Sequence, residues 1–296
     1  MSAFSNESFS PHKCAEETLC FRAIAQRLKK ENTTMEYFII IMVCFLSSVV
    51  GAICGIGGGV IIKPVLDATG ILAVTTGSFL SGCTVLSMSV VSMYKNMRAK
   101  HDFVFDKAFA TMIAAGGVAG GISGKALYEM VLRRLSDTSH VGAVQAAVLL
   151  VITIGTLLYT INKKNIKTKK LSSNPVIFLI GIVLGIMSSF LSIGGGPINL
   201  VVLFYFFSMT SKQAAMYSIY IIMFSQISSL FVTVVRGKTP VFELPTLLLM
   251  IGCGILGGLV GSKINKKIDN KTVDHLFIGL MAIIIVINIF NIYRYS

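Results

Sequence analysis

Long apolar runs alternate with short polar stretches over most of the chain. The runs fall at about 37–66, 71–94, 105–130, 141–162, 175–208, 213–235, 243–264 and 273–293. A helix needs about 20 residues to cross the hydrocarbon core of a bilayer, which is about 30 Å thick. Most of the runs match that length. The pattern predicts an all-α polytopic membrane protein with about eight transmembrane segments.

The first and fifth runs are too long for one crossing, and each contains a glycine-rich motif. Residues 175–208 would extend about 51 Å as a single helix. The motif Gly55-Ile56-Gly57-Gly58-Gly59 returns 137 residues later as Ser192-Ile193-Gly194-Gly195-Gly196, and the two copies are followed by Pro64 and Pro197. Because glycine weakens helices, we expect each run to consist of two shorter helical pieces joined at the glycines.

The two halves of the chain match beyond these motifs, which predicts two repeats of four segments. At the same offset, Val104-Phe105-Asp106 corresponds to Val241-Phe242-Glu243, and Gly117, Gly120, Gly121 and Gly124 correspond to Gly254, Gly257, Gly258 and Gly261. Ser78 and Ser218 are expected to be partners, that is, to match each other when the alignment of the two halves is shifted by three residues. The matched glycines form stripes of small residues, and such stripes let helices approach closely in lipid.

The predicted organisation has four parts. A polar N-terminal tail (1–35) precedes membrane repeat 1 (36–162), and a basic linker (163–174) joins it to membrane repeat 2 (175–293). Met35 directly precedes the first apolar run and is an alternative start of translation.

Two arrangements of the interrupted segments remain open. If all eight runs cross, the loops on the N-terminal side carry 17 Lys and Arg residues against 9 on the other side, and the positive-inside rule places both termini in the cytoplasm. If the interrupted segments dip in and return, the repeats are inverted, as in many transporters, and the count becomes about 12 against 14. The charge count favours eight crossings, whereas the excess length of the two runs favours a partial return.

Composition narrows the class of protein further. Hydrophobic residues make up 54% of the chain and charged residues 13%, with a mean hydropathy of +0.79; a soluble protein of this size needs far more polar surface. The net charge of +13 comes largely from basic residues between the apolar runs, as in the stretch 163–170. That placement suits the anionic inner leaflet of a membrane. We therefore expect a lipid bilayer, and not nucleic acid, as the partner.

Each glycine break is a candidate anion-binding site. Broken helices persist in hydrocarbon only where they are buried in protein or face an aqueous cavity. The start of the second piece offers free N–H groups and the positive end of the helix dipole. Two such breaks predict one shared cradle near the midplane; the alternative is two independent packing kinks. The candidate substrate-binding residues are Gly57, Gly58, Gly59, Lys63, Pro64, Ser78, Gly194, Gly195, Gly196, Pro197, Asn199 and Ser218.

The ionisable residues argue against cation transport and against catalysis. No Asp or Glu lies in the middle of an apolar run, whereas cation transporters and proton relays normally carry buried acids. The histidines and cysteines have no spacing typical of a metal site or a catalytic site. We expect an anionic substrate, no metal, no cofactor and no enzymatic activity.

The two glycine motifs with their prolines, and the repeated four-segment plan, resemble the TauE/SafE family of sulfite-exporter-like membrane proteins. The resemblance covers about residues 36–293. It implies a permease for sulfur-containing anions such as sulfite and sulfonates, multi-pass in a cell membrane of the bacterial inner-membrane type. Two features depart from the family pattern. The second copy begins with Ser192 and has its proline directly after the glycines, and Lys63 stands where many members have an apolar residue.

The sequence therefore predicts a secondary transporter for a small anion: sulfite, a sulfonate or a related sulfur-containing oxyanion. The chain has no P-loop for ATP, so energy would come from a gradient or from a partner protein. Two alternatives remain, a membrane enzyme acting on a lipid or quinone and an assembly subunit without transport. The sequence leaves the formation of a homo-oligomer open.

Overall fold

A computed structural model describes residues 34–98, 105–134, 138–163 and 165–295. Most of the predicted polar tail (1–33) and Val104 lie outside the described residues. Residues 41–296 form one compact unit. Residues 34–40 belong to a separate unit and are described only as the start of helix Thr34–Cys54.

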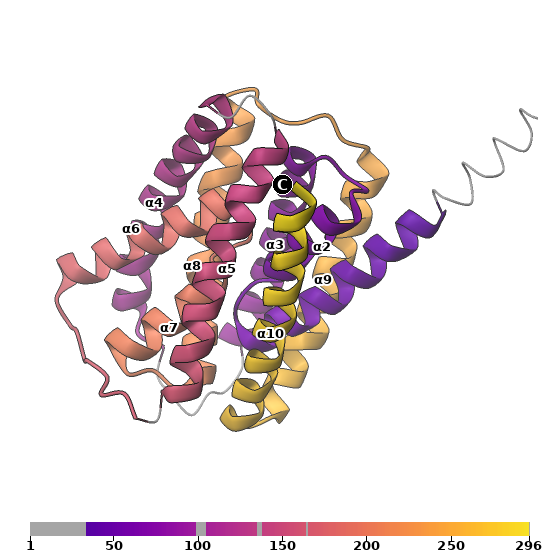
Figure 1. The fold of residues 1–296 in the computed structure, drawn as a ribbon. Helices are drawn as coiled ribbons and strands as arrows, with labels where there is room; N and C mark the ends of the chain where they lie inside the picture. Colours follow the sequence, from indigo (N-terminus) through magenta and orange to yellow (C-terminus); the bar gives the residue numbers. More distant parts are fainter. Residues whose placement is uncertain (1–33, 99–104, 135–137, 164, 296) are drawn as a thin grey trace, which may run out of the picture. The chain divides into compact units, whose positions relative to one another are not determined.

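The prediction of an all-α fold is confirmed, because the described residues contain helices and no strand. After the first helix, Thr34–Cys54, the helices are α2 (Gly59–Thr69), α3 (Val74–Met97), α4 (Lys107–Arg134), α5 (Thr138–Asn162), α6 (Asn174–Leu191), α7 (Gly196–Phe207), α8 (Ser211–Val235), α9 (Leu244–Lys267) and α10 (Asn270–Tyr295). Figure 1 shows α5 and α10 packed side by side in front of the other helices.

Seven helices among the described residues are long and apolar enough to cross a membrane: the first helix and α3, α5, α6, α8, α9 and α10. α4 has 28 residues but is not one of them, because its glycines dilute its apolar side chains. α7 is apolar but has only 12 residues. By length and composition, the structure is therefore that of a polytopic membrane protein.

The chain reverses direction at the second glycine motif. α6 runs parallel to α4, because Gly116 of α4 faces Gly181 and Gly124 of α4 faces Ile186. The residues that lead into α6 then meet the end of α7, where the Lys169 N–H donates to the Tyr205 carbonyl over 2.7 Å. α6 and α7 therefore enter and leave the bundle at the same end.

The first glycine motif produces the same reversal. The first helix runs parallel to α9, since Gly257 faces Phe45, and Asn265 further along α9 donates to the Ile53 carbonyl over 2.5 Å. α10 leads away from that end of the bundle. α2 finishes beside the last turn of α10, where Arg294 donates to a carbonyl at the C-terminal end of α2. α2 therefore runs back against the first helix.

This arrangement differs from the eight full crossings that the charge count favours. The charge count uses only the loops, whereas the chain turns at buried residues inside the bundle. The turning residues have a left-handed backbone, with φ of 77° at Gly55 and 94° at Gly195. Glycine reaches this region without the steric cost that a Cβ imposes.

Glycines also let two pairs of helices touch at their backbones. A Cβ placed on Gly120 would lie 2.1 Å from the Ile182 carbonyl oxygen, and one on Gly261 would lie 2.3 Å from the Val49 carbonyl oxygen. α4 of the first half thus packs on α6 of the second half, and α9 of the second half packs on the first helix. The predicted role of the glycine stripes in close helix packing is confirmed.

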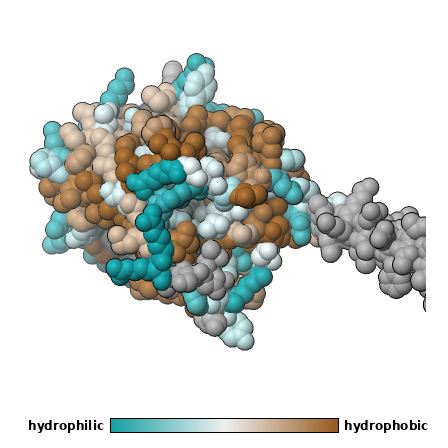
Figure 2. Space-filling view, turned by 90° about the horizontal axis from the view of Figure 1, so that it is seen from above, coloured by the Kyte–Doolittle hydropathy of each residue, from teal (hydrophilic) through white to brown (hydrophobic). Residues whose placement is uncertain are grey.

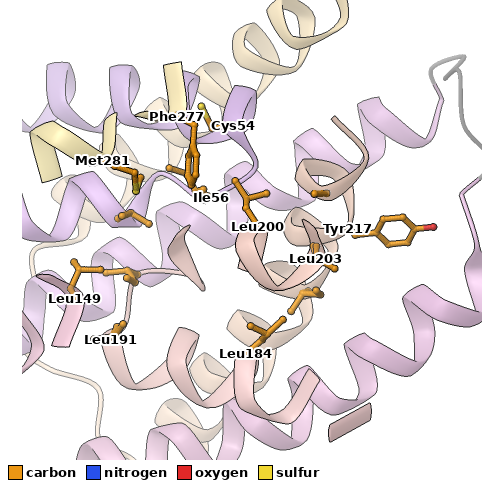
Figure 3. Packing of buried hydrophobic residues seen from close by; sticks show 14 of the residues in the cluster. Cys54, Ile56, Leu149, Leu184, Leu191, Leu200, Leu203, Tyr217, Phe277 and Met281 are labelled. Carbon is orange, nitrogen blue, oxygen red and sulfur yellow. The ribbon is translucent and has the colours of Figure 1, made fainter. Parts of the chain in front are cut away.

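Buried apolar side chains of both halves surround the two motifs. Figure 3 shows Ile56 of the first motif beside Phe277 of α10. The Tyr217 ring points away from this group (Figure 3), and it stacks on Phe105 with ring centroids 4.8 Å apart. The Tyr217 hydroxyl oxygen accepts a hydrogen bond from the Asp106 N–H over 2.7 Å. This contact fixes the start of α4 against α8.

Candidate functional site

Each glycine motif forms a buried turn between two helices. The first helix ends at Cys54 and α2 begins at Gly59, while α6 ends at Leu191 and α7 begins at Gly196. Within the described part of the chain, no side chain caps the start of α2 or of α7. Both helix starts therefore keep N–H groups that no side chain of the described residues satisfies.

The two turns touch each other. A Cβ placed on Gly59 would lie 2.7 Å from the Ile193 carbonyl oxygen, and one on Gly57 would lie 3.5 Å from the Gly194 carbonyl oxygen. Val85 of α3 and Ile222 of α8 each contact both Gly57 and Gly194. The breaks of the two halves therefore lie together at the centre of the bundle.

Asn199 places a polar side chain in the first turn of α7. It is fully buried, and neither its amide nitrogen nor its amide oxygen has a hydrogen-bond partner among the described residues. The side chain lies over Gly195, where a Cβ would be 2.4 Å from Asn199 Nδ2. A buried amide without partners costs free energy, so this group is suited to bind water or a ligand.

A polar cavity of about 80 Å³ lies beside the second break. α3, α4 and α8 form its walls, together with Ser192 of the motif and the connection between α8 and α9. Its polar lining residues are Thr75, Ser78, Lys125, Tyr128, Glu129, Ser192, Gln226, Ser229, Thr233 and Lys238. These side chains offer hydroxyl, amide and ammonium donors, which is the set that an oxyanion accepts.

Two lysines, Lys125 and Lys238, and one acid, Glu129, are the charged residues that line this cavity. Glu129 is 8% exposed, and its Oε2 accepts hydrogen bonds from Lys238 and, over 3.2 Å, from Arg236. Lys125 lies 4.7 Å from the centre of the Tyr128 ring. Figure 2 views the molecule from the end where the chain passes from α8 to α9, and shows hydrophilic residues over its middle with hydrophobic residues around them.

The surroundings of Ser192 differ from those of the matched residue, Gly55. At the matched position, a Cβ on Gly55 would lie 2.2 Å from Ala215 Cα, so α8 packs directly against the first motif. Ser192 carries a side chain, and Ser78, which stands at the position matched to Ala215, lines the cavity. The departure from glycine at the start of the second motif thus coincides with an opening between the motif and α3.

The predicted site residues fall into separate groups. Gly57, Gly59, Gly194 and Gly196 form the contact between the two turns, and Gly58 packs against the first helix. Gly195, Pro197 and Asn199 lie buried at the start of α7. Ser78 lines the cavity, whereas Lys63 and Pro64 line a second cavity of about 10 Å³. That these residues bind substrate stays a prediction.

Ser78 and Ser218, which were expected to be partners, do not occupy equivalent positions in the two halves of the structure. Val85 and Ile222 occupy equivalent places between the two turns, and they are 137 residues apart, as the motifs are. One turn earlier on the same faces are Ser81 and Ser218, at the same offset. Both hydroxyls are buried without a hydrogen-bond partner in the described residues. No slip of three residues is needed.

The sequence interpretation missed several cavity residues. Ser229 and Thr233 follow Gln226 at helical spacing along one face of α8, a polar stripe within an apolar run that is visible in the sequence. Lys125 and Lys238 join them only because α4 and the end of α8 meet in the fold. No periodicity within one segment could have shown that meeting.

The expectation about buried acids also needs correction. Asp67 is 6% exposed, and its Oδ2 lies 2.5 Å from Lys63 Nζ. Asp67 directly follows the first apolar run and lies outside its bounds. Its spacing of four residues from Lys63 is the signal that the sequence offers. The charge of Lys63 is therefore offset within α2 and is not free to neutralise an anion in this structure.

Residues 40–287 match the family described as sulfite exporter TauE/SafE. The chain belongs to this family. Membership in TauE/SafE, with the apolar helices, makes the chain a multi-pass membrane protein of a transporter family. No curated protein and no solved structure matches the chain.

Proposed function

We propose that this TauE/SafE chain is a secondary transporter for a small sulfur-containing oxyanion, either sulfite, a sulfonate or a related anion. It works as a permease in a cell membrane of the bacterial inner-membrane type. The family description supports the substrate class. Lys125 and Lys238 line the cavity against one acid, Glu129, and this excess of positive charge supports an anion within that class.

The cavity that reaches Ser192 is the observation that carries this proposal. Lysine side chains lie at its rim, and it also offers hydroxyl and amide donors, including Gln226 beside Gly194. An anion drawn in by the basic rim exchanges water for these donors. The volume of about 80 Å³ suits an anion of a few heavy atoms and excludes large organic anions.

The proposal includes two inverted repeats with the interrupted segments as returning hairpins. Three contacts that occur twice support it. α4 packs on α6 as α9 packs on the first helix, α5 pairs with α7 as α10 pairs with α2, and Val85 corresponds to Ile222. Inverted repeats permit alternating access when one repeat moves against the other.

The difference between the two motifs then identifies this conformation as one that is open beside the second motif and closed beside the first. The cavity at Ser192 communicates with one end of the bundle, while the matched place at Gly55 is sealed by Ala215. Transport requires the place at Gly55 to open as the cavity at Ser192 closes. The anion passes the contact between the two turns, where Asn199 offers unused donors and acceptors.

Reconstitution in liposomes tests the function. Counterflow of radiolabelled sulfite, methanesulfonate, sulfate and acetate is measured with purified protein, and we expect flux for the sulfur oxyanions and little for acetate. Gly195→Leu should abolish this flux while protein remains in the membrane, because φ is 94° at Gly195 and Asn199 fills the space beside it. Absence of flux for the whole panel would reject the proposal.

The two alternatives give different results in the same preparation. An enzyme acting on a lipid or quinone would convert added substrate to product without moving an anion. An assembly subunit would neither bind nor move any anion of the panel. Cross-linking in the liposomes tests whether copies of the chain associate.

A further inference from the structure

An ion pair is buried in α2 beside the anion cavity. Lys63 Nζ lies 2.5 Å from Asp67 Oδ2, and the two side chains are 3% and 7% exposed. Such a pair stabilises a fold little, because removing two charges from water costs about as much as their attraction returns. Ionisable residues inside membrane segments commonly mark the path of an ion or a proton.

Asp67 has one carboxylate oxygen available for a proton. Its Oδ1 accepts no hydrogen bond from any described residue, and it lies 3.9 Å from the place where a Cβ on Gly77 of α3 would be. Asp67 therefore satisfies only half of its hydrogen-bonding capacity, through Lys63.

The charged and titratable groups that face Asp67 are few. α10 provides Tyr295, whose hydroxyl donates to the Asp67 carbonyl over 3.4 Å, and Arg294, which donates to the next carbonyl. α4 provides Tyr128, which interacts electrostatically with Asp67. α5 contributes the neutral Gln145, and α3 contributes Gly77. Among the described residues in contact, Lys63 is the cation that pairs with this carboxylate.

The ion pair and the anion cavity share a wall. Lys63 and Asp67 line the small cavity together with Leu191 and Ile193 of the second break. Ser192, between those two residues, lines the larger anion cavity. The small cavity holds at most about one water molecule, which is enough to deliver a proton. A change of charge at Asp67 therefore changes the electrostatic potential in the anion cavity, which lies across one turn of backbone.

We propose that Asp67 is the proton-binding site that couples a proton to the transported anion. A proton from water forms an O–H bond at Oδ1 and removes the negative charge of the carboxylate. Lys63 keeps its charge and loses its partner. An anion in the cavity supplies the missing negative charge across the shared wall, so the proton and the anion bind together and leave together. This inference rests on the proposed function and specifies proton symport for it.

Proton uptake by the purified protein tests the inference. Sodium methanesulfonate or sodium sulfate is added to protein in weak buffer with a pH dye; neither anion takes up protons itself near neutral pH. We expect about one proton taken up per anion bound. In liposomes, an inward pH gradient should drive accumulation of the anion by up to about tenfold per pH unit.

Asp67→Asn should remove proton uptake and gradient-driven accumulation of the anion. Since this variant leaves Lys63 unpaired, the double variant Lys63→Gln and Asp67→Asn provides a neutral pair that keeps the fold. Asp274→Asn is the matched control, because Asp274 pairs with Lys163 at 2.6 Å in a partly exposed place. It should keep both responses.

The outcomes separate the inference from the proposed function. Counterflow without proton uptake in the natural protein would reject the coupling and leave the transporter intact. Proton uptake that persists in the neutral double variant would show that the pair is only structural. Loss of counterflow in every preparation, the natural protein included, would reject the transporter itself.

Discussion

Gly59→Ala tests the contact between the two glycine turns directly. Gly59 is the first residue of α2 and does not have a positive φ, so alanine causes no backbone strain there. Its Cβ would lie 2.7 Å from both the Ile193 carbonyl oxygen and Val85 Cγ2. Ordinary contact begins near 3.4 Å, so the turns must separate by about 0.7 Å.

The expected magnitude follows from this shift. Overpacking of an interior costs about 1–3 kcal/mol, and the better helix former returns at most about 1 kcal/mol. We expect the Tm in detergent to fall by up to a few degrees. Displacement of about 0.7 Å at the proposed site should lower the counterflow rate at least about tenfold, as positional errors of this size do in enzymes.

Gly252→Ala in α9 is the matched control, because nothing lies within 4 Å of its Cβ position. It should leave the flux unchanged and should not lower the Tm, because alanine is the better helix former. If Gly59→Ala behaves like Gly252→Ala in both measurements, the two turns are not in contact and the shared site at the centre of the bundle is wrong.

The remaining predictions use the same preparations. Lys238→Gln should lower the counterflow rate about fivefold or more at low salt, because it removes a cation from the cavity rim, whereas Lys170→Gln, in the exposed linker, should have no effect; equal loss in both would mean that only total charge matters. Gly120→Ala should destabilise the protein by about 1–3 kcal/mol, because its Cβ would meet the Ile182 carbonyl oxygen. Gly279→Ala, with open space around it, should not, and equal thermal unfolding of the two would contradict the close packing of α4 on α6.

The sequence was most informative where the chemistry is local. Glycine triplets in overlong apolar runs predict interruptions at Gly57 and Gly194, because the cost of glycine in a helix does not depend on the rest of the fold. The packing role of Gly120 and Gly257 follows in the same way, since small residues in membrane helices serve close approach.

Features that depend on the assembled bundle could not be predicted. The return of the chain after each break is decided by packing of α2 on α10 and of α7 on α5, and loop charges do not report it. The cavity needs Lys125 from α4, Gln226 from α8 and Ser192 from the motif at one place. Asp67 stood at the margin of an apolar run, and only the fold shows that this margin is buried.

The exchange of helices between the halves has a consequence for how the fold assembles. Gly120 of α4 in the first half meets α6 of the second half, and Gly261 of α9 meets the first helix. Either half made alone would leave its glycine face without the helix that it fits. The bundle can therefore close only when both halves are present, because residues as far apart in the chain as Val49 and Gly261 must meet before that glycine face is buried.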